Sequence, residues 1–174
     1  LSKVNKVLFV ETDIRRPSVL KVLGEESKEL SGFSDLITGA VDFKTTLFKV
    51  PGSDLNVVTS GARRTDLTDV TNQPKLKAFF KLLSNYYDYI ILDSPPIQPV
   101  SDTLLIAQSV DHTVLIARSQ FTKMLGVRST IKKLQNLNIK ADGIILNSMD
   151  TSRSSYYGYY YYYGGYYNKG YKYA

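Results

Sequence analysis

Residues 7–17 read Val7-Leu8-Phe9-Val10-Glu11-Thr12-Asp13-Ile14-Arg15-Arg16-Pro17. The four apolar residues at the start, rich in β-branched and aromatic types, predict a short strand. Two acids, one residue apart, end this strand, and two arginines follow them. A carboxylate at the end of a buried strand is costly unless water, a counter-charge or a cation compensates for the lost solvation. The stretch therefore predicts an apolar sheet with a charged strand end.

A second stretch repeats this arrangement. Residues 89–96 read Tyr89-Ile90-Ile91-Leu92-Asp93-Ser94-Pro95-Pro96. Neighbouring strands lie about 4.8 Å apart, so two such strand ends in one sheet could bring their acids close together. Mg²⁺ takes carboxylates, waters and substrate phosphates as ligands, and this geometry suits it. One Asp before a turn is ordinary, so the specific signal is the pair of stretches.

The rest of residues 1–150 predicts an α/β domain. Further strands are expected around residues 57–58, 113–117 and 143–146, and their continuous apolar character favours strands covered on both faces, as in a parallel sheet. Two apolar stripes at helical spacing lie between them, and a third helix, capped by Ser101 or Asp102, is expected through Ala107. The stripes consist of Leu76, Phe79, Phe80 and Leu83, and of Met124, Val127, Ile131, Leu134 and Leu137. This alternation predicts a doubly wound, mostly parallel sheet that binds its ligand at the carboxyl ends of the strands.

Composition limits the possible functions. The 174 residues contain no Cys, which excludes disulfides and thiol chemistry, and they carry a net charge of +6. Most of the basic residues are scattered along the body, so we expect no nucleic-acid partner. The single His112 begins an apolar run and is expected to be a strand-edge residue. No apolar stretch approaches the roughly 20 residues needed to span a bilayer.

Residues 151–174 differ from the body in composition. This segment contains Ser, Thr, Gly and three cations without periodicity, and we expect it to be a flexible tail. It holds eleven of the chain's fourteen tyrosines. Each phenol could accept a phosphoryl group; alternatively the segment is a sticky aromatic stretch with no chemical role. The tyrosines are Tyr156, Tyr157, Tyr159, Tyr160, Tyr161, Tyr162, Tyr163, Tyr166, Tyr167, Tyr171 and Tyr173.

Together these features resemble the cytoplasmic domain of the bacterial tyrosine kinases that regulate capsule and exopolysaccharide export. The Walker A′ motif of that family looks like Glu11-Thr12-Asp13-Ile14-Arg15, and its Walker B motif looks like residues 90–96. Residues 100–102, 114–118 and 143–147 and the terminal tyrosine cluster also follow the family. The resemblance covers nearly the whole chain. Each motif alone is also similar to those of septum-site and plasmid-partition ATPases.

The resemblance implies a P-loop type domain over residues 1–150, with ATP and Mg²⁺ as cofactors. Asp13 and Asp93 would hold the metal, and Glu11 would accept or orient the phenol proton. Arg15 would contact the phosphates, or else form only a surface ion pair, and Asn147 would lie near the adenine. The tyrosines of the tail would be phosphorylated in trans within a homo-oligomeric ring, by resemblance an octamer.

The resemblance also implies partners and a location. These are a membrane activator of the polysaccharide co-polymerase type, in cis or in trans, a cognate tyrosine phosphatase, and the cytoplasmic side of the bacterial inner membrane. Phosphorylation would regulate polysaccharide polymerisation and export.

Two features depart from the family pattern. Glu11 stands where the family usually has Asp, and its extra methylene displaces the carboxylate. The phosphate loop Gly-x-x-x-x-Gly-Lys-Ser/Thr is absent, although in the family it lies on a strand and helix that would precede Leu1. We therefore expect these residues to be part of a longer chain and to bind ATP poorly by themselves.

Two other functions stay open at the level of sequence. A partition-type ATPase switch would turn over ATP without forming phosphotyrosine. A non-enzymatic interaction module would associate through its tyrosine-rich segment without any dependence on nucleotide.

Overall fold

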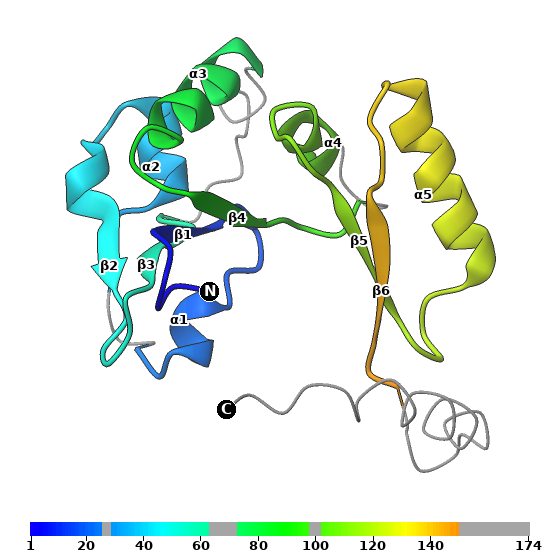
Figure 1. The fold of residues 1–174 in the computed structure, drawn as a ribbon, viewed down its shortest axis with the longest axis horizontal. Coiled ribbons are helices and arrows are strands. Elements are labelled where there is room, and N and C mark those ends of the chain that lie inside the picture. Colours follow the sequence, from blue (N-terminus) through cyan, green and yellow to red (C-terminus); the bar gives the residue numbers. More distant parts are fainter. Residues whose placement is uncertain (26–28, 63–72, 98–101, 150–174) are drawn as a thin grey trace, which may run out of the picture.

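The computed structural model describes residues 1–25, 29–62, 73–97 and 102–149. Strands and helices alternate along most of this chain (Figure 1). None of the described helices is long and apolar enough to cross a membrane. In chain order the elements are β1 (Val7–Glu11), α1 (Val19–Val22), α2 (Phe33–Thr38), the 3-10 helix η1 (Phe43–Thr46), β2 (Leu47–Lys49), β3 (Asn56–Val58), α3 (Gln73–Leu83), β4 (Tyr89–Asp93), α4 (Asp102–Ala107), β5 (Val114–Arg118), α5 (Met124–Asn136) and β6 (Gly143–Asn147).

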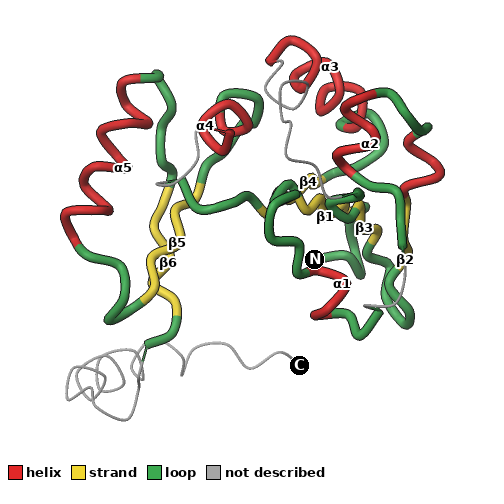
Figure 2. The backbone as a smooth tube through the Cα atoms, turned by 180° about the vertical axis from the view of Figure 1, so that it is seen from behind, coloured by secondary structure: helices red, strands yellow, loops and turns green. Residues whose placement is uncertain are grey.

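The strands form two sheets. The larger has the order β2-β3-β1-β4, and the smaller consists of β5 and β6. Among the described strands, β1 pairs in parallel with both β3 and β4, β5 pairs in parallel with β6, and β2 pairs antiparallel with β3. The predicted strands and the mostly parallel α/β class are confirmed. Figure 2 shows α5 running alongside the β5–β6 pair.

Two apolar clusters hold the described residues together. The larger contains Leu8 and Val10 of β1, Leu76 and Leu83 of α3, and residues of α2 and α4. The smaller contains Ala107, Leu134 and Ile139, with Leu115 packed against them. Helix α4 contributes to both, because Ile106 lies in the first cluster and the next residue, Ala107, lies in the second. This short helix therefore connects the packing of the two sheets.

Not every expectation about burial is met. The stripe on α3 is a core face as predicted, but on α5 only Leu134 of the predicted stripe is fully buried, and Met124 is 66% exposed. Strands β4, β5 and β6 were expected to be covered on both faces. In the structure Ile91 of β4, Ile116 of β5 and its register partner Ile145 of β6 are exposed, so one face of these strands has no covering element among the described residues. On β6 the other face is exposed as well, at Leu146.

A close backbone approach fixes the entrance to α2. Gly32 precedes this helix, and its N–H donates to the buried carboxylate of Asp35, while Phe33 N donates to the carbonyl of Thr59, the residue after β3. A Cβ atom at Gly32 would overlap the carbonyl oxygen of Thr59 and the nitrogen of Gly61. The contact requires glycine because only hydrogen fits between the two backbones.

Gly32→Ala should therefore destabilise the fold. Overpacking against rigid backbone typically costs about 1–3 kcal/mol, which we expect to see as a lower denaturation midpoint. Gly143→Ala is the matched control, since a Cβ there would meet nothing within 4 Å, and we expect a change within about 0.5 kcal/mol. Equal midpoints for the two variants in urea unfolding would contradict this account of the α2 entrance.

Candidate active site

The two acidic stretches meet at the carboxyl ends of β1 and β4. The strands pair in parallel with Val7 opposite Tyr89 and Glu11 opposite Asp93, so both end at the same level. Thr12, the residue after β1, extends the pairing of the two strands. Both its backbone N–H and its hydroxyl donate to the carbonyl of Asp93, at 2.7 and 2.8 Å. The sequence placed these acids together through a general property of parallel sheets, and the register confirms it.

The carboxylate of Glu11 is buried, with only 1% of the residue exposed. Its Oε1 accepts hydrogen bonds from the backbone N–H groups of Ser18 and Val19, at the start of α1. Its Oε2 accepts from the N–H of Ser60, after β3, at 3.1 Å. One side chain thus ties together the ends of β1 and β3 and the start of α1. These bonds favour a positioning role for Glu11 over the predicted role in accepting a proton.

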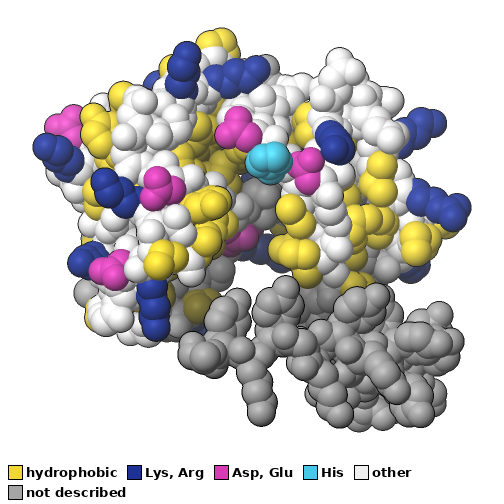
Figure 3. Space-filling model, viewed as in Figure 1, with side chains coloured by type: hydrophobic (Ala, Val, Ile, Leu, Met, Phe, Trp, Pro, Cys, Tyr) yellow, Lys and Arg dark blue, Asp and Glu magenta, His cyan; other side chains and the backbone are white. Residues whose placement is uncertain are grey.

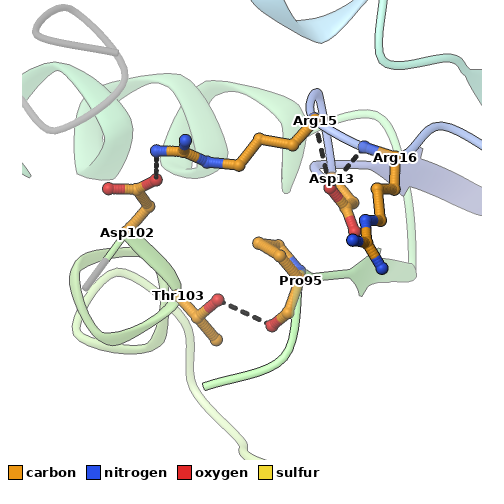
Figure 4. A network of polar contacts seen from close by, with 6 residues as sticks. All are labelled: Asp13, Arg15, Arg16, Pro95, Asp102 and Thr103. Atoms are coloured by element: carbon orange, nitrogen blue, oxygen red, sulfur yellow. Dashed lines mark hydrogen bonds and ion pairs between the residues drawn. The ribbon is translucent and has the colours of Figure 1, made fainter. Parts of the chain in front are cut away.

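Asp13 and Arg15 lie on the loop that follows β1 (Figure 4). The Oδ1 atom of Asp13 accepts from the backbone N–H groups of Arg15 and Arg16, at 3.1 and 3.0 Å, which fixes the turn. The Arg15 guanidinium forms an ion pair of 3.0 Å with Asp102, the first residue of α4. Below it, the Thr103 hydroxyl donates to the carbonyl of Pro95. The loop after β1 is therefore connected to α4, which follows β4.

Among the acids at this strand end, Asp93 has a carboxyl group with a raised pKa. Partial desolvation raises the pKa of its carboxyl group above the ordinary value of 3.8, and the nearby charges of Glu11 and Asp13 raise it further. Glu11 and Asp13 are thus close enough to Asp93 for their charges to repel its carboxylate. Like charges gathered at one strand end favour a bound cation, because it would relieve this repulsion.

The donor set fits a hard cation that is completed by other ligands. Among the described residues no group of three or more His, Asp or Glu side chains is arranged to hold a metal. Glu11 is occupied by backbone donors, which leaves the carboxylates of Asp13 and Asp93. Mg²⁺ is commonly bound by one or two carboxylates, with waters and substrate phosphates filling the other positions.

Asn147, a predicted site residue, and His112, expected at a strand edge, lie in or beside the smaller sheet. Asn147 ends β6, opposite Arg118 of β5 in the smaller sheet, and its Oδ1 accepts from the N–H of Ser148. His112 is exposed before β5 and lies 3.3 Å from Asp142. The predicted phosphorylation sites at residues 156–173 lie outside the described residues.

Sequence reasoning missed several functional contacts. It treated Asp102 only as a helix cap, and it had no signal for Ser18 or Ser60 as donors to Glu11. Arg15 and Asp102 are 87 residues apart in the sequence, and Glu11 and Ser60 are 49 residues apart. No local sequence pattern predicts contacts between residues so far apart.

The bonds of Glu11 lead to a stability prediction. Glu11→Gln replaces one acceptor oxygen by an amide that cannot accept, so at least one buried N–H loses its partner, and we expect a loss of about 1–3 kcal/mol. The control is Asp13→Asn, because the remaining side-chain oxygen can still accept from Arg15 and Arg16. Urea unfolding of both variants makes the comparison. A Glu11→Gln protein as stable as its parent would contradict the positioning role.

Asp93 should behave in the opposite way. Because its pKa is higher in the folded chain than the ordinary value of 3.8, stability falls as the pH rises through that interval, and at neutral pH the charge destabilises the fold. Asp93→Asn should therefore raise the melting temperature at pH 7. The gain should shrink as the pH falls through the raised pKa toward 3.8, where both states become protonated.

A thermal melt series from pH 7 to pH 4 measures this effect. Asp54→Asn is the control, because Asp54 is 71% exposed and pairs only loosely, at 3.9 Å, with Lys49. A lower melting temperature for Asp93→Asn at pH 7 would show that the Asp93 carboxylate is stabilising and that the repulsion is absent.

Similarity to known sequences supports the interpretation of the site. No family model matches the chain. Over 158 residues, 88% of the chain, it is 30% identical to CapB of Staphylococcus aureus and covers 67% of that protein. It is also 30% identical to AmsA of Erwinia amylovora over 154 residues, but spans only 21% of AmsA's length. Both relatives carry the description tyrosine-protein kinase.

Solved structures agree with this relationship. The VpsO kinase domain superposes with a TM-score of 0.79 at 26% identity, covering 86% of this chain and 73% of that domain. MinD, in its complex with MinC from Aquifex aeolicus, shares the fold with a TM-score of 0.69 at 19% identity, over 86% of this chain and 59% of that one. The paired acidic strand ends thus stand on the same α/β scaffold as in these proteins, and the chain belongs to the family of bacterial tyrosine-protein kinases.

Proposed function

We propose that this protein is an ATP-dependent tyrosine kinase that phosphorylates the tyrosine cluster of residues 156–173 in trans. The observation that carries the proposal is the convergence of Glu11, Asp13 and Asp93 at one strand end, where partial desolvation and the charges of Glu11 and Asp13 raise the pKa of Asp93. Membership of the kinase family and the eleven tyrosines of the terminal segment support it.

Asp13 and Asp93 are the residues that would hold Mg²⁺. When bound, the ion would offset the negative charge that develops on the transferred phosphoryl group. Phosphoryl transfer depends mostly on positioning and electrostatics, so the chain's contribution is to hold these two carboxylates in a fixed relation. The shared hydrogen bonds of Thr12 with the Asp93 carbonyl do this for the two strand ends.

Each remaining residue has a role that follows from its contacts. Glu11 anchors the loop that carries Asp13. We assign Arg15 to the phosphates, supported by its place beside Asp13, although it is held by Asp102 in this structure. A carboxylate oxygen of Asp13 or Asp93 that is not bound to the metal would accept a hydrogen bond from the incoming phenol, whose free pKa is about 10. The placement of Asn147 near the adenine rests on the family resemblance alone.

Phosphorylation would change the charge of the assembly. Each phosphotyrosine adds about −1.5 to −2 charges, so three or four would cancel the chain's net charge of +6. In a homo-oligomeric ring, negatively charged terminal segments would repel one another and weaken the ring. We further propose a membrane activator, a phosphatase that resets the cycle, and control of polysaccharide export at the inner membrane.

Phosphotyrosine mapping tests the proposal. The full-length gene product, pretreated with phosphatase, is incubated with Mg²⁺ and ATP and digested for mass spectrometry. We expect several phosphates between Tyr156 and Tyr173, and a loss of about 100-fold or more in Asp93→Asn, which removes a charged ligand of the reacting phosphates. Asp54→Asn, an exposed acid far from the strand ends in sequence, should retain the parent's activity.

Two other outcomes would redirect the assignment. ATP hydrolysis with an unmodified terminal segment would identify a partition-type ATPase switch. Neither phosphotyrosine nor ATP turnover, in a protein that remains folded, would contradict an enzymatic role altogether.

A further inference from the structure

Two acids of the described chain are buried, and both accept hydrogen bonds from the segment that follows β3. Acidic side chains usually lie at the surface, where water solvates them, as several do on the face of the molecule in Figure 3. Glu11 and Asp35 are instead only 1% and 8% exposed. The N–H of Ser60 donates to Glu11 at 3.1 Å. The N–H of Ala62 donates to Asp35 at 3.3 Å.

This segment, residues 59–62, which we call the β3 loop, is hydrogen-bonded to the start of α2. The N–H of Phe33 donates to the carbonyl of Thr59 at 2.7 Å. The N–H of Ser34 donates to the carbonyl of Ser60 at 2.9 Å. Backbone N–H groups in the first turn of a helix have no partner within the helix, so both donors are free to hold the loop.

Side chains of α2 hold the β3 loop as well. The same Oδ2 atom of Asp35 that accepts from Ala62 also accepts from the N–H of Gly32, at 3.0 Å. The hydroxyl of Ser34 donates to the carbonyl of Ala62 at 3.0 Å. Gly61 has a φ of 78°, and a Cβ atom there would overlap Oδ2 of Asp35. The loop is therefore packed directly against this carboxylate, and its position depends on Asp35.

The β3 loop in turn orients Glu11. Oε1 of Glu11 accepts from the N–H groups of Ser18 and Val19, and Oε2 accepts from the N–H of Ser60. A carboxylate is a rigid planar group, so the bond to Ser60 also fixes the direction of the other oxygen. If the loop moved, a buried carboxylate oxygen would lose its donor, which is costly. Glu11 would then turn toward another donor, and its bonds to Ser18 and Val19 would weaken.

The segment that carries Asp13 is held at both of its ends. It begins at Thr12, whose N–H and hydroxyl donate to the carbonyl of Asp93. It ends at Ser18, whose N–H donates to Glu11. The turn that contains Asp13 lies between these two attachments, so its position relative to Asp93 depends on both of them.

We propose that Asp35 is a positioning residue for phosphoryl transfer. Asp35 holds the β3 loop, the loop orients Glu11, and Glu11 fixes the segment that carries Asp13 at the end remote from β1. We call this series of bonds the Asp35 relay. It requires no contact between Asp35 and the substrate. The inference rests on the proposed function, because it assigns Asp35 to the reaction at Asp13 and Asp93.

Hydrogen exchange tests the relay without nucleotide. The full-length gene product is compared with Asp35→Ala, which removes the acceptor, and with Leu134→Ala, which opens the smaller apolar cluster. Exchange is measured by mass spectrometry on peptides that contain Ser18 and Val19, at a temperature where thermal melts show all three proteins folded. We expect exchange there to be about 10-fold faster in Asp35→Ala and unchanged in Leu134→Ala, because local opening need not follow global stability.

The Mg²⁺ dependence of tyrosine phosphorylation tests the consequence for the reaction. Removing a residue that orients metal ligands commonly lowers metal affinity 10-fold or more, so Asp35→Ala should need about 10-fold more Mg²⁺ for its half-maximal rate. Leu134→Ala should keep the parent's requirement. Asp35→Asn should recover most of both losses, because its amide oxygen can still accept from Gly32 and Ala62. If Asp35→Ala does not fold, Ser34→Ala, which removes only the hydroxyl bonded to Ala62, should change both measurements in the same direction.

Three results would overturn the proposal. The first is exchange at Ser18 and Val19 that is the same in Asp35→Ala and in the parent. The second is faster exchange with an unchanged Mg²⁺ requirement, which would leave Asp35 with a structural role alone. The third is an equal shift in Leu134→Ala, which would indicate general loosening. A parent protein that forms no phosphotyrosine would contradict the proposed function, and the exchange comparison would then still decide whether Asp35 positions the segment that carries Asp13.

Discussion

The parallel pairing of β1 with β4 is the constraint on which the rest of the site depends. It fixes Glu11 opposite Asp93 and brings Asp13 to the same edge. Each of these carboxylates is handled differently by its surroundings. Glu11 accepts hydrogen bonds from three backbone N–H groups, one oxygen of Asp13 accepts hydrogen bonds from the turn that follows it, and Asp93 has a raised pKa. Three carboxylates at one strand end thus have three roles: Glu11 anchors the backbone, Asp13 fixes a turn, and Asp93 is repelled by its neighbours.

The repulsion at Asp93 is informative because a sequence selected for stability alone would not contain it. A neutral residue at position 93 would relieve the repulsion from Glu11 and Asp13, and the surrounding backbone bonds do not require an acid there. Retained like charges are a common feature of functional sites, where stability is given up for a local field. The Arg15 guanidinium carries the opposite charge, but it forms its ion pair with Asp102 of α4.

Much of the fold follows from sequence where the apolar signal is long and periodic. The runs at residues 89–92 and 113–117 and the stripe on α3 are strong enough for local pattern to decide. The region between Val19 and Lys49 is different, because α1, α2 and β2 are short, and the start of α2 is fixed by a distant partner, Thr59. Glu11 shows the same limit within the site. Its type and position were evident, but its donors come from residues 18, 19 and 60, which no spacing rule connects.

Helix α4 links the two sheets, and one of its contacts, the ion pair between Asp102 and Arg15, depends on salt. Six residues connect the packing of both sheets, and the N-terminal residue of this helix is held by a single guanidinium whose side chain is 46% exposed. Exposed ion pairs weaken as salt rises, since the Debye length shrinks from about 10 Å at 0.1 M to about 3 Å at 1 M. Apolar packing around Ile106 and Ala107 is not screened in this way. Raising the ionic strength therefore weakens the Arg15 contact at the start of α4 and leaves the apolar packing of the helix against both clusters unchanged.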